Sequence, residues 1–130
     1  MVIDAMVPML NVEEIDRSIG FYTTVLPFQV AQTAGPASDP SWALLQAGAV
    51  KLMLNKSARA GGRVQSLRPS GTDAVLVLTV GSVREAQAML RAKGIAVDDI
   101  ARQPYGMEEI RLRDPDGYEL AIASPMMRIA

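Results

Sequence analysis

The same order of predicted elements occurs twice along this chain of 130 residues. Each half contains one segment whose apolar residues recur at helical spacing. Around it lie short runs that are β-branched or alternate between apolar and polar residues, which is typical of strands, and turns that contain Gly or Pro separate these runs. The order in both halves is strand, helix, strand, strand, strand. The halves superpose when Val7 is laid on Val75, which places Met53 on Ala121. Because few residues are identical between the halves, the order of elements, more than the letters, indicates an internal duplication.

Each half contains one predicted helix. In the first, apolar residues recur at helical spacing over Glu13–Leu26. The second covers Val83–Lys93, where Ser82 and Glu85 form a capping box and Gly94 stands at the position of a C-terminal glycine.

The predicted strands flank these helices. They are Val7–Val12, Gln29–Gln32, Trp42–Gln46 and Val50–Asn55 in the first half, and Val75–Val80, Ala96–Asp99, Glu108–Arg113 and Glu119–Ala123 in the second. The turn sequence Asp114-Pro115-Asp116-Gly117 joins the last two strands into a hairpin. We therefore expect one domain over residues 1–130, made of a module at 1–56, a linker at 57–71 and a module at 72–130.

Two missing residue types exclude much chemistry. The chain has no Cys and no His, which rules out disulfides, thiolate metal sites, a Cys nucleophile, a Ser-His-Asp triad and His-ligated metals. Any metal would need oxygen ligands, which favour Mg, Ca or Mn. With 13 Lys and Arg against 14 Asp and Glu, the net charge is -1, so we expect no nucleic-acid partner.

The sequence also predicts a cytoplasmic protein with no membrane partner. No apolar run approaches the ~20 residues that a membrane-spanning helix needs. The segment Met1–Leu10 contains Asp4 and no Lys or Arg, which is unlike a signal peptide.

Motifs at both ends of the chain point to a known family. The opening motif is Leu10-x-Val12-x-x-Ile15-x-x-Ser18-x-x-Phe21-Tyr22, and the closing one is Tyr105-Gly106-x-x-Glu109 followed by the Asp114–Gly117 turn. In order and spacing they resemble the vicinal oxygen chelate superfamily, which contains glyoxalase I, extradiol dioxygenases, fosfomycin-resistance enzymes and bleomycin-resistance proteins. The resemblance covers nearly the whole chain. It implies an α+β fold of two tandem βαβββ modules that form a cup-shaped mixed sheet, usually completed by a homodimer.

The same resemblance implies where a metal would be held. The metal-binding members use one ligand from the first strand and one from the last strand of each module. By the motif spacing these positions fall on Val7, Met53, Val75 and Ala121. None of these side chains binds a divalent cation, so we expect no metal and no cofactor.

Strand alternation then selects candidate ligand-binding residues on the faces turned away from the helices. They are Met9, Asn11, Trp42, Met53, Tyr105, Met107, Glu109 and Arg111. Soft and aromatic walls with a few polar groups are typical of small-molecule pockets. Structural roles remain open beside this interpretation: the Met residues can fill core volume, and Glu109 can pair with Arg111, or Arg111 with Glu119.

The leading hypothesis is a metal-free protein that binds a small molecule and sequesters a drug or toxic metabolite, as bleomycin-resistance proteins do. An alternative is a glyoxalase- or dioxygenase-like lyase or isomerase. It would use Glu109 or Tyr105 as an acid or base, or hold a cation through carboxylates such as Glu119. A structural or regulatory role with a closed cup is a third possibility. The sequence leaves open whether the protein is an enzyme.

Overall fold

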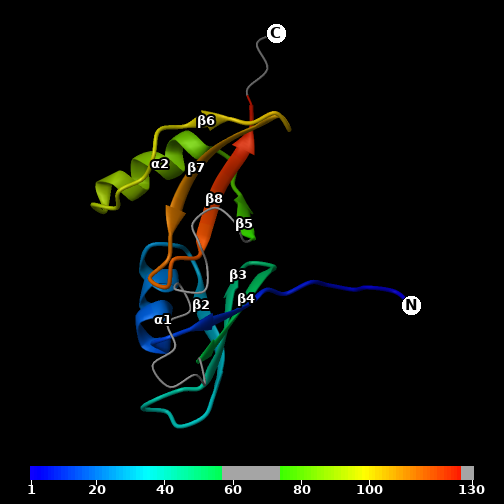
Figure 1. Ribbon diagram of the computed structural model, residues 1–130, viewed down its shortest axis with the longest axis vertical. Coiled ribbons are helices and arrows are strands. Elements are labelled where there is room, and N and C mark those ends of the chain that lie inside the picture. Colours follow the sequence, from blue (N-terminus) through cyan, green and yellow to red (C-terminus); the bar gives the residue numbers. More distant parts are fainter. Residues whose placement is uncertain (57–73, 127–130) are drawn as a thin grey trace. The chain divides into compact units, whose positions relative to one another are not determined.

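The structure, a computed structural model, describes residues 1–56 and 74–126 (Figure 1). The chain divides into two compact units, Met1–Arg68 and Pro69–Ala130, each of which contains one βαβββ module. The predicted linker at 57–71 lies outside the described residues.

The first module forms a four-stranded mixed sheet. Its elements are β1 (Met9–Val12), α1 (Ile15–Thr24), β2 (Gln29–Ala34), β3 (Trp42–Ala47) and β4 (Val50–Lys56). The strand order is β1-β4-β3-β2, with β1 parallel to β4 and the other neighbours antiparallel. This arrangement confirms the βαβββ order that the sequence predicts.

Helix α1 is shorter than predicted at both ends. Glu14 is its N-cap and has extended backbone angles, so residues before Ile15 lie outside the helix. At the other end Phe28 N–H donates to the Tyr22 carbonyl at 3.2 Å, which folds the chain back under the helix. The rings of Tyr22 and Phe28 then meet edge to face with centroids 6.0 Å apart.

Alternation along the strands fixes the two faces of the first sheet. The core positions are Leu10, Val12, Ala43, Leu45, Leu52 and Leu54, all at most 6% exposed. The residues between them point the other way, so Met9 is 54% exposed on a face that the core does not use. We call this second side, made of Met9, Asn11, Trp42, Leu44, Met53 and Asn55, the open face of the first sheet.

The second module repeats the arrangement. Its elements are β5 (Val75–Thr79), α2 (Val83–Ala92), β6 (Ala101–Arg102), β7 (Met107–Arg113) and β8 (Glu119–Pro125), in the sheet order β5-β8-β7-β6. The Ser82 half of the predicted capping box is confirmed, because the Ser82 hydroxyl accepts the Glu85 N–H at 3.2 Å. The hydroxyl of Ser124 on β8 accepts the Val83 N–H at 3.0 Å, which ties the start of the helix to the sheet.

The predicted strand Ala96–Asp99 is wrong, and the third element of this module is the two-residue strand β6. Side chains of α2 hold this segment instead. Gln87 Nε2 donates to the Asp98 carbonyl at 3.1 Å, and Arg91 Nη2 pairs with the Asp99 carboxylate at 3.2 Å. Backbone groups of the segment therefore bond to the helix rather than to β7.

The two modules differ as a result. In the first, β2 pairs with β3 from Gln29 to Ala34. In the second, β6 pairs only with Glu108 and Glu109, so β7 runs on past the end of its neighbour. No helix in the described parts of the chain is long and apolar enough to span a membrane.

Candidate functional site

The open face of the first sheet brings together the ligand-binding residues predicted in the first half. Met9 on β1 is in register with Met53 on β4, which is in register with Leu44 on β3. One row along, Asn11, Asn55 and Trp42 are aligned in the same way. This face thus carries a row of two methionines and a leucine beside a row of two amides and the only indole of the chain.

A hydrogen bond orders the polar row. Asn55 Nδ2 donates to Asn11 Oδ1 at 3.2 Å across β1 and β4. Asn55 uses one of its two N–H donors in this bond, so its other donor and its carbonyl oxygen can serve a bound molecule. Asn55 is a neighbour that the sequence analysis did not select, although its alternation with Met53 would have indicated it.

In the second module the predicted polar residues form one hydrogen-bonded group, which we call the Arg111 network: Tyr105, Glu109, Arg111 and Glu119. The Glu109 carboxylate is only 1% exposed and accepts hydrogen bonds from the Tyr105 hydroxyl and from Arg111 Nε. Arg111 Nη1 donates to Glu119 Oε1 at 2.8 Å. Both structural pairings that the sequence left open are therefore formed.

The last predicted residue of this half, Met107, begins β7 and is half-buried opposite Pro125. It shares the strand face of Glu109 and Arg111 by alternation. The structure places it at the end of the hairpin where Tyr105 also lies.

Within the Arg111 network the pKa values of Tyr105, Glu109 and Arg111 are moved away from neutrality. Burial alone raises the pKa of Glu109, but hydrogen bonds from Tyr105 and Arg111 and the charge of Arg111 outweigh it, so this pKa is lowered. The hydrogen bond to Glu109, followed by burial and the Glu109 charge, raises the pKa of Tyr105. The bonds to Glu109 and Glu119 raise the pKa of Arg111 against the effect of burial.

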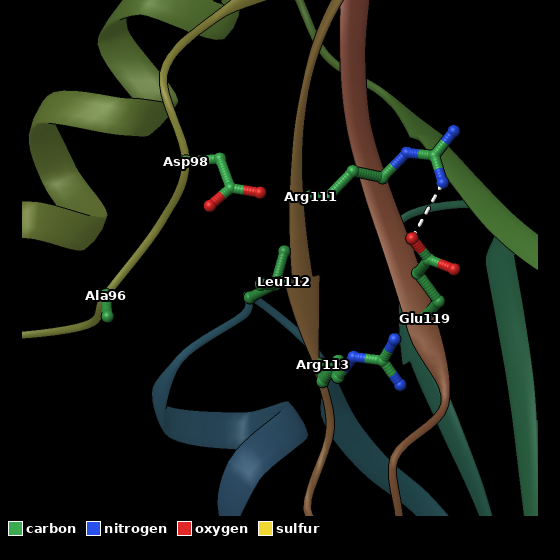
Figure 2. A pocket seen from close by; sticks show the side chains of 6 residues that line it. All are labelled: Ala96, Asp98, Arg111, Leu112, Arg113 and Glu119. Carbon is green, nitrogen blue, oxygen red and sulfur yellow. Dashed lines mark hydrogen bonds and ion pairs between the residues drawn. The ribbon is translucent and has the colours of Figure 1, made fainter. Parts of the chain in front are cut away.

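A pocket of about 440 Å³ opens beside this network (Figure 2). Its lining residues are Ala96, Asp98, Arg111, Leu112, Arg113 and Glu119. The side chains of Arg111 and Glu119 face one another there, and Asp98 reaches in from the segment after α2. Of the predicted ligand-binding residues only Arg111 lines this pocket.

Two charged lining residues, Arg113 and Asp98, are not among the predicted ligand-binding residues. Arg113 Nη1 donates to the Gly117 carbonyl at 3.2 Å, within the turn that joins β7 and β8. The strand face that Arg113 shares with Arg111 is the sequence signal from which this position could have been predicted. Asp98 is exposed, and no sequence signal places its segment beside β7.

The positions that would hold the family's divalent cation do not fit one. Met53 is in register with Met9, and Ala121 is in register with Val77 and Arg111, so apolar or cationic side chains surround them. The nearby carboxylates of Glu109 and Glu119 already bind the Arg111 guanidinium. Within residues 1–56 and 74–126 no group of three or more Asp or Glu side chains is arranged to hold a metal ion.

Solved structures with this fold include both binding proteins and enzymes. TnmS3, an antibiotic binding protein from Streptomyces sp. CB03234, is 20% identical, with a TM-score of 0.73 and coverage of 97% of this chain and 99% of that chain. The bleomycin resistance determinant of transposon Tn5 is 20% identical, with a TM-score of 0.71 and coverage of 96% and 100%. Lactoylglutathione lyase from Agrobacterium tumefaciens is 19% identical, with a TM-score of 0.69 and coverage of 93% of both chains.

At these identities the structural likeness shows the fold alone. No curated protein matches the sequence. The family model described as the Glyoxalase/Bleomycin resistance protein/Dioxygenase superfamily matches residues 3–122, which is nearly the whole chain. Together with the two βαβββ modules, this match shows that the chain belongs to the glyoxalase/bleomycin resistance protein/dioxygenase superfamily.

Proposed function

We propose that this protein binds a small molecule without a metal ion and sequesters it, as a drug- or toxin-binding member of its superfamily. The observation that carries the proposal is the Arg111 network. Its one guanidinium binds both Glu109 and Glu119, the carboxylates that an enzyme would need as metal ligands or as a base.

A metal site at these carboxylates would be costly to form. A cation bound to Glu109 or Glu119 would displace Arg111, whose side chain is 35% exposed, or lie beside its positive charge. The other family positions, occupied by Val7, Met53, Val75 and Ala121, offer no oxygen ligand.

Acid–base catalysis by the same group is also disfavoured. A general base or acid works best with a pKa near the working pH. The network lowers the pKa of Glu109 and raises that of Tyr105, so the carboxylate stays ionised and the phenol stays neutral around pH 7. These directions suit a fixed binding surface better than proton transfer.

The ligand-binding residues that we propose lie on both modules. Met9, Met53 and Trp42 supply adaptable and aromatic contacts, for which Met and Trp are well suited. Asn11 supplies polar contacts in the first module. Tyr105, Met107, Glu109 and Arg111 supply the second set. We further propose that the protein works as a cytoplasmic homodimer, which the resemblance to drug-binding relatives supports.

Native mass spectrometry after incubation with Mg, Mn, Fe, Ni and Zn tests the proposal. We expect a dimer mass with no specifically bound metal. Any additional small-molecule mass that survives purification would begin to identify the ligand. One tightly bound cation per subunit would overturn the metal-free function and favour an enzyme.

A matched variant shows whether any bound cation occupies the site. Glu119→Gln removes one carboxylate while Arg111 keeps its bond to Glu109. A cation that persists in this variant and in Glu109→Gln is held elsewhere. A cation that is lost in either variant is held by the Arg111 network, which contradicts the proposal directly.

A further inference from the structure

The pocket in the second module lies where a strand is missing. The β6–β7 ladder pairs Ala101 with Glu109 and Arg102 with Glu108, and it does not continue to Arg111. The Gln103 N–H donates to the Met107 carbonyl at 2.8 Å, so the backbone groups of Met107 face β6. Because this orientation alternates along a strand, the backbone N–H and C=O of Arg111 face the same side, beyond the end of β6.

The segment that contains Ala96 and Asp98 forms the wall of the pocket across from β7, and side chains of α2 hold it there. Gln87 binds the Asp98 carbonyl, and Arg91 binds the Asp99 carboxylate and, at 3.5 Å, the Val97 carbonyl. The segment containing Ala96 and Asp98 is therefore anchored to α2. The resulting gap of about 440 Å³ is within the size range of small-molecule sites.

Asp98 supplies to this gap a carboxylate that is unpaired within the described part of the chain. Its carboxylate extends from the anchored segment toward β7 (Figure 2). Among residues 1–56 and 74–126 no side chain pairs with it, whereas Arg111 is bound by Glu109 and Glu119. A positively charged group that enters the pocket can therefore pair with the Asp98 carboxylate.

We propose that this pocket binds the amino-terminal end of a short peptidic molecule. The ammonium group pairs with Asp98, and the extended backbone adds to the edge of β7 through the N–H and C=O of Arg111, as peptides do when they extend a sheet. This inference rests on the proposed small-molecule function. It adds to that function a ligand class and a subsite whose residues all belong to the second module.

An NMR titration of the ¹⁵N-labelled full chain with trialanine amide tests this subsite. We expect the largest amide shifts at Arg111 and its strand neighbours. N-acetylated trialanine amide, which has no ammonium group, should bind more weakly. A probe with an N-methylated central amide should also bind more weakly, because it loses a strand hydrogen bond.

Two charge-matched variants complete the test. Asp98→Asn should weaken binding of trialanine amide about two- to fivefold, as expected for one partly exposed ion pair. Asp16→Asn makes the same change at an exposed position of α1, in the other module, and should leave the affinity unchanged. Absence of shifts at Arg111, or equal affinity for the free and acetylated peptides, would overturn the proposal.

The outcomes separate this inference from the proposed function. If trialanine amide does not bind but other small molecules alter Trp42 fluorescence and no metal is held, only the peptide subsite fails. If the peptide binds as described but native mass spectrometry finds one cation per subunit, the metal-free function fails and the subsite stands.

Discussion

Arg111 on β7 and Glu119 on β8 link the two strands of the last hairpin, because Arg111 Nη1 donates to Glu119 Oε1 at 2.8 Å. The two residues are diagonal neighbours, since Arg111 is in register with Ala121 and Glu119 with Arg113. The same guanidinium also binds Glu109, whose side chain is 1% exposed compared with 21% for Glu119. The two carboxylates therefore share one partner at different depths.

We expect this difference in depth to give unequal stability effects. Glu109→Ala removes a buried carboxylate and leaves two part-buried donors, the Tyr105 hydroxyl and Arg111 Nε, without their shared acceptor, which should lower the free energy of unfolding by about 1–3 kcal/mol. Glu119→Ala removes a partly exposed pair and should lower it by about 1 kcal/mol or less. Urea unfolding of both variants measures the two losses. Equal losses would contradict the burial of Glu109.

Stability should also fall in acid because of Glu109. Its pKa is lowered from the ordinary value of 4.5 by the folded network, so its contribution is fully present above that value. The contribution disappears as the pH falls through the lower folded pKa. We expect Glu109→Gln to be less stable than the wild type at pH 7 and the difference to shrink progressively below pH 4.5. Urea unfolding across this range checks it, and a difference that grows in acid would have the wrong sign.

Tyr105 should ionise at higher pH than an ordinary tyrosine. The hydrogen bond to Glu109 raises its pKa above the usual value of 10.0. In Glu109→Gln the acceptor carries no charge, so the Tyr105 pKa should move back toward that value. Ultraviolet titration of tyrosinate follows the change, and Tyr105→Phe identifies which transition belongs to this residue. A transition that is unaffected by Glu109→Gln would show that the two groups do not interact.

Truncation of the adjacent residues Leu54 and Met53 on β4 should affect stability to very different extents. Leu54 is fully buried beneath α1, and Leu54→Ala should cost about 2–5 kcal/mol of stability. Met53 is only half-buried on the open face, so Met53→Ala should cost much less while weakening ligand binding. Thermal unfolding compares the two variants. A large loss for Met53→Ala would place it in the core, which is the structural alternative for these Met residues.

These faces follow from the sequence because a strand alternates with a period of two. Once β1 and β4 are recognised, Met9 and Met53 must share one face and Leu10 and Leu54 the other. The Glu109–Arg111 pair is likewise a local relationship, since residues two apart on a strand lie on one side.

The pocket could not be found in this way. Ala96–Asp99 follows a helix at the place where the first module has a strand, but the side chains of Gln87 and Arg91 on α2 hold it instead. These bonds depend on how the helix turns relative to the segment that follows it, which local propensity does not determine. The site role of Asp98 is a consequence of the same displacement.

Trp42 offers the most direct assay of the open face of the first sheet. It is the only Trp of the chain and is partly exposed beside Asn55, so its fluorescence reports on molecules that bind there. For any compound that changes this signal, Trp42→Phe should weaken binding measured by calorimetry about two- to tenfold. This range corresponds to the loss of about 0.5–1.5 kcal/mol of aromatic stacking. The core beneath, formed by Ala43 and Leu45, is untouched, so the unfolding midpoint should change little. Unchanged affinity would remove Trp42 from the site and leave the second module as the place where the ligand binds.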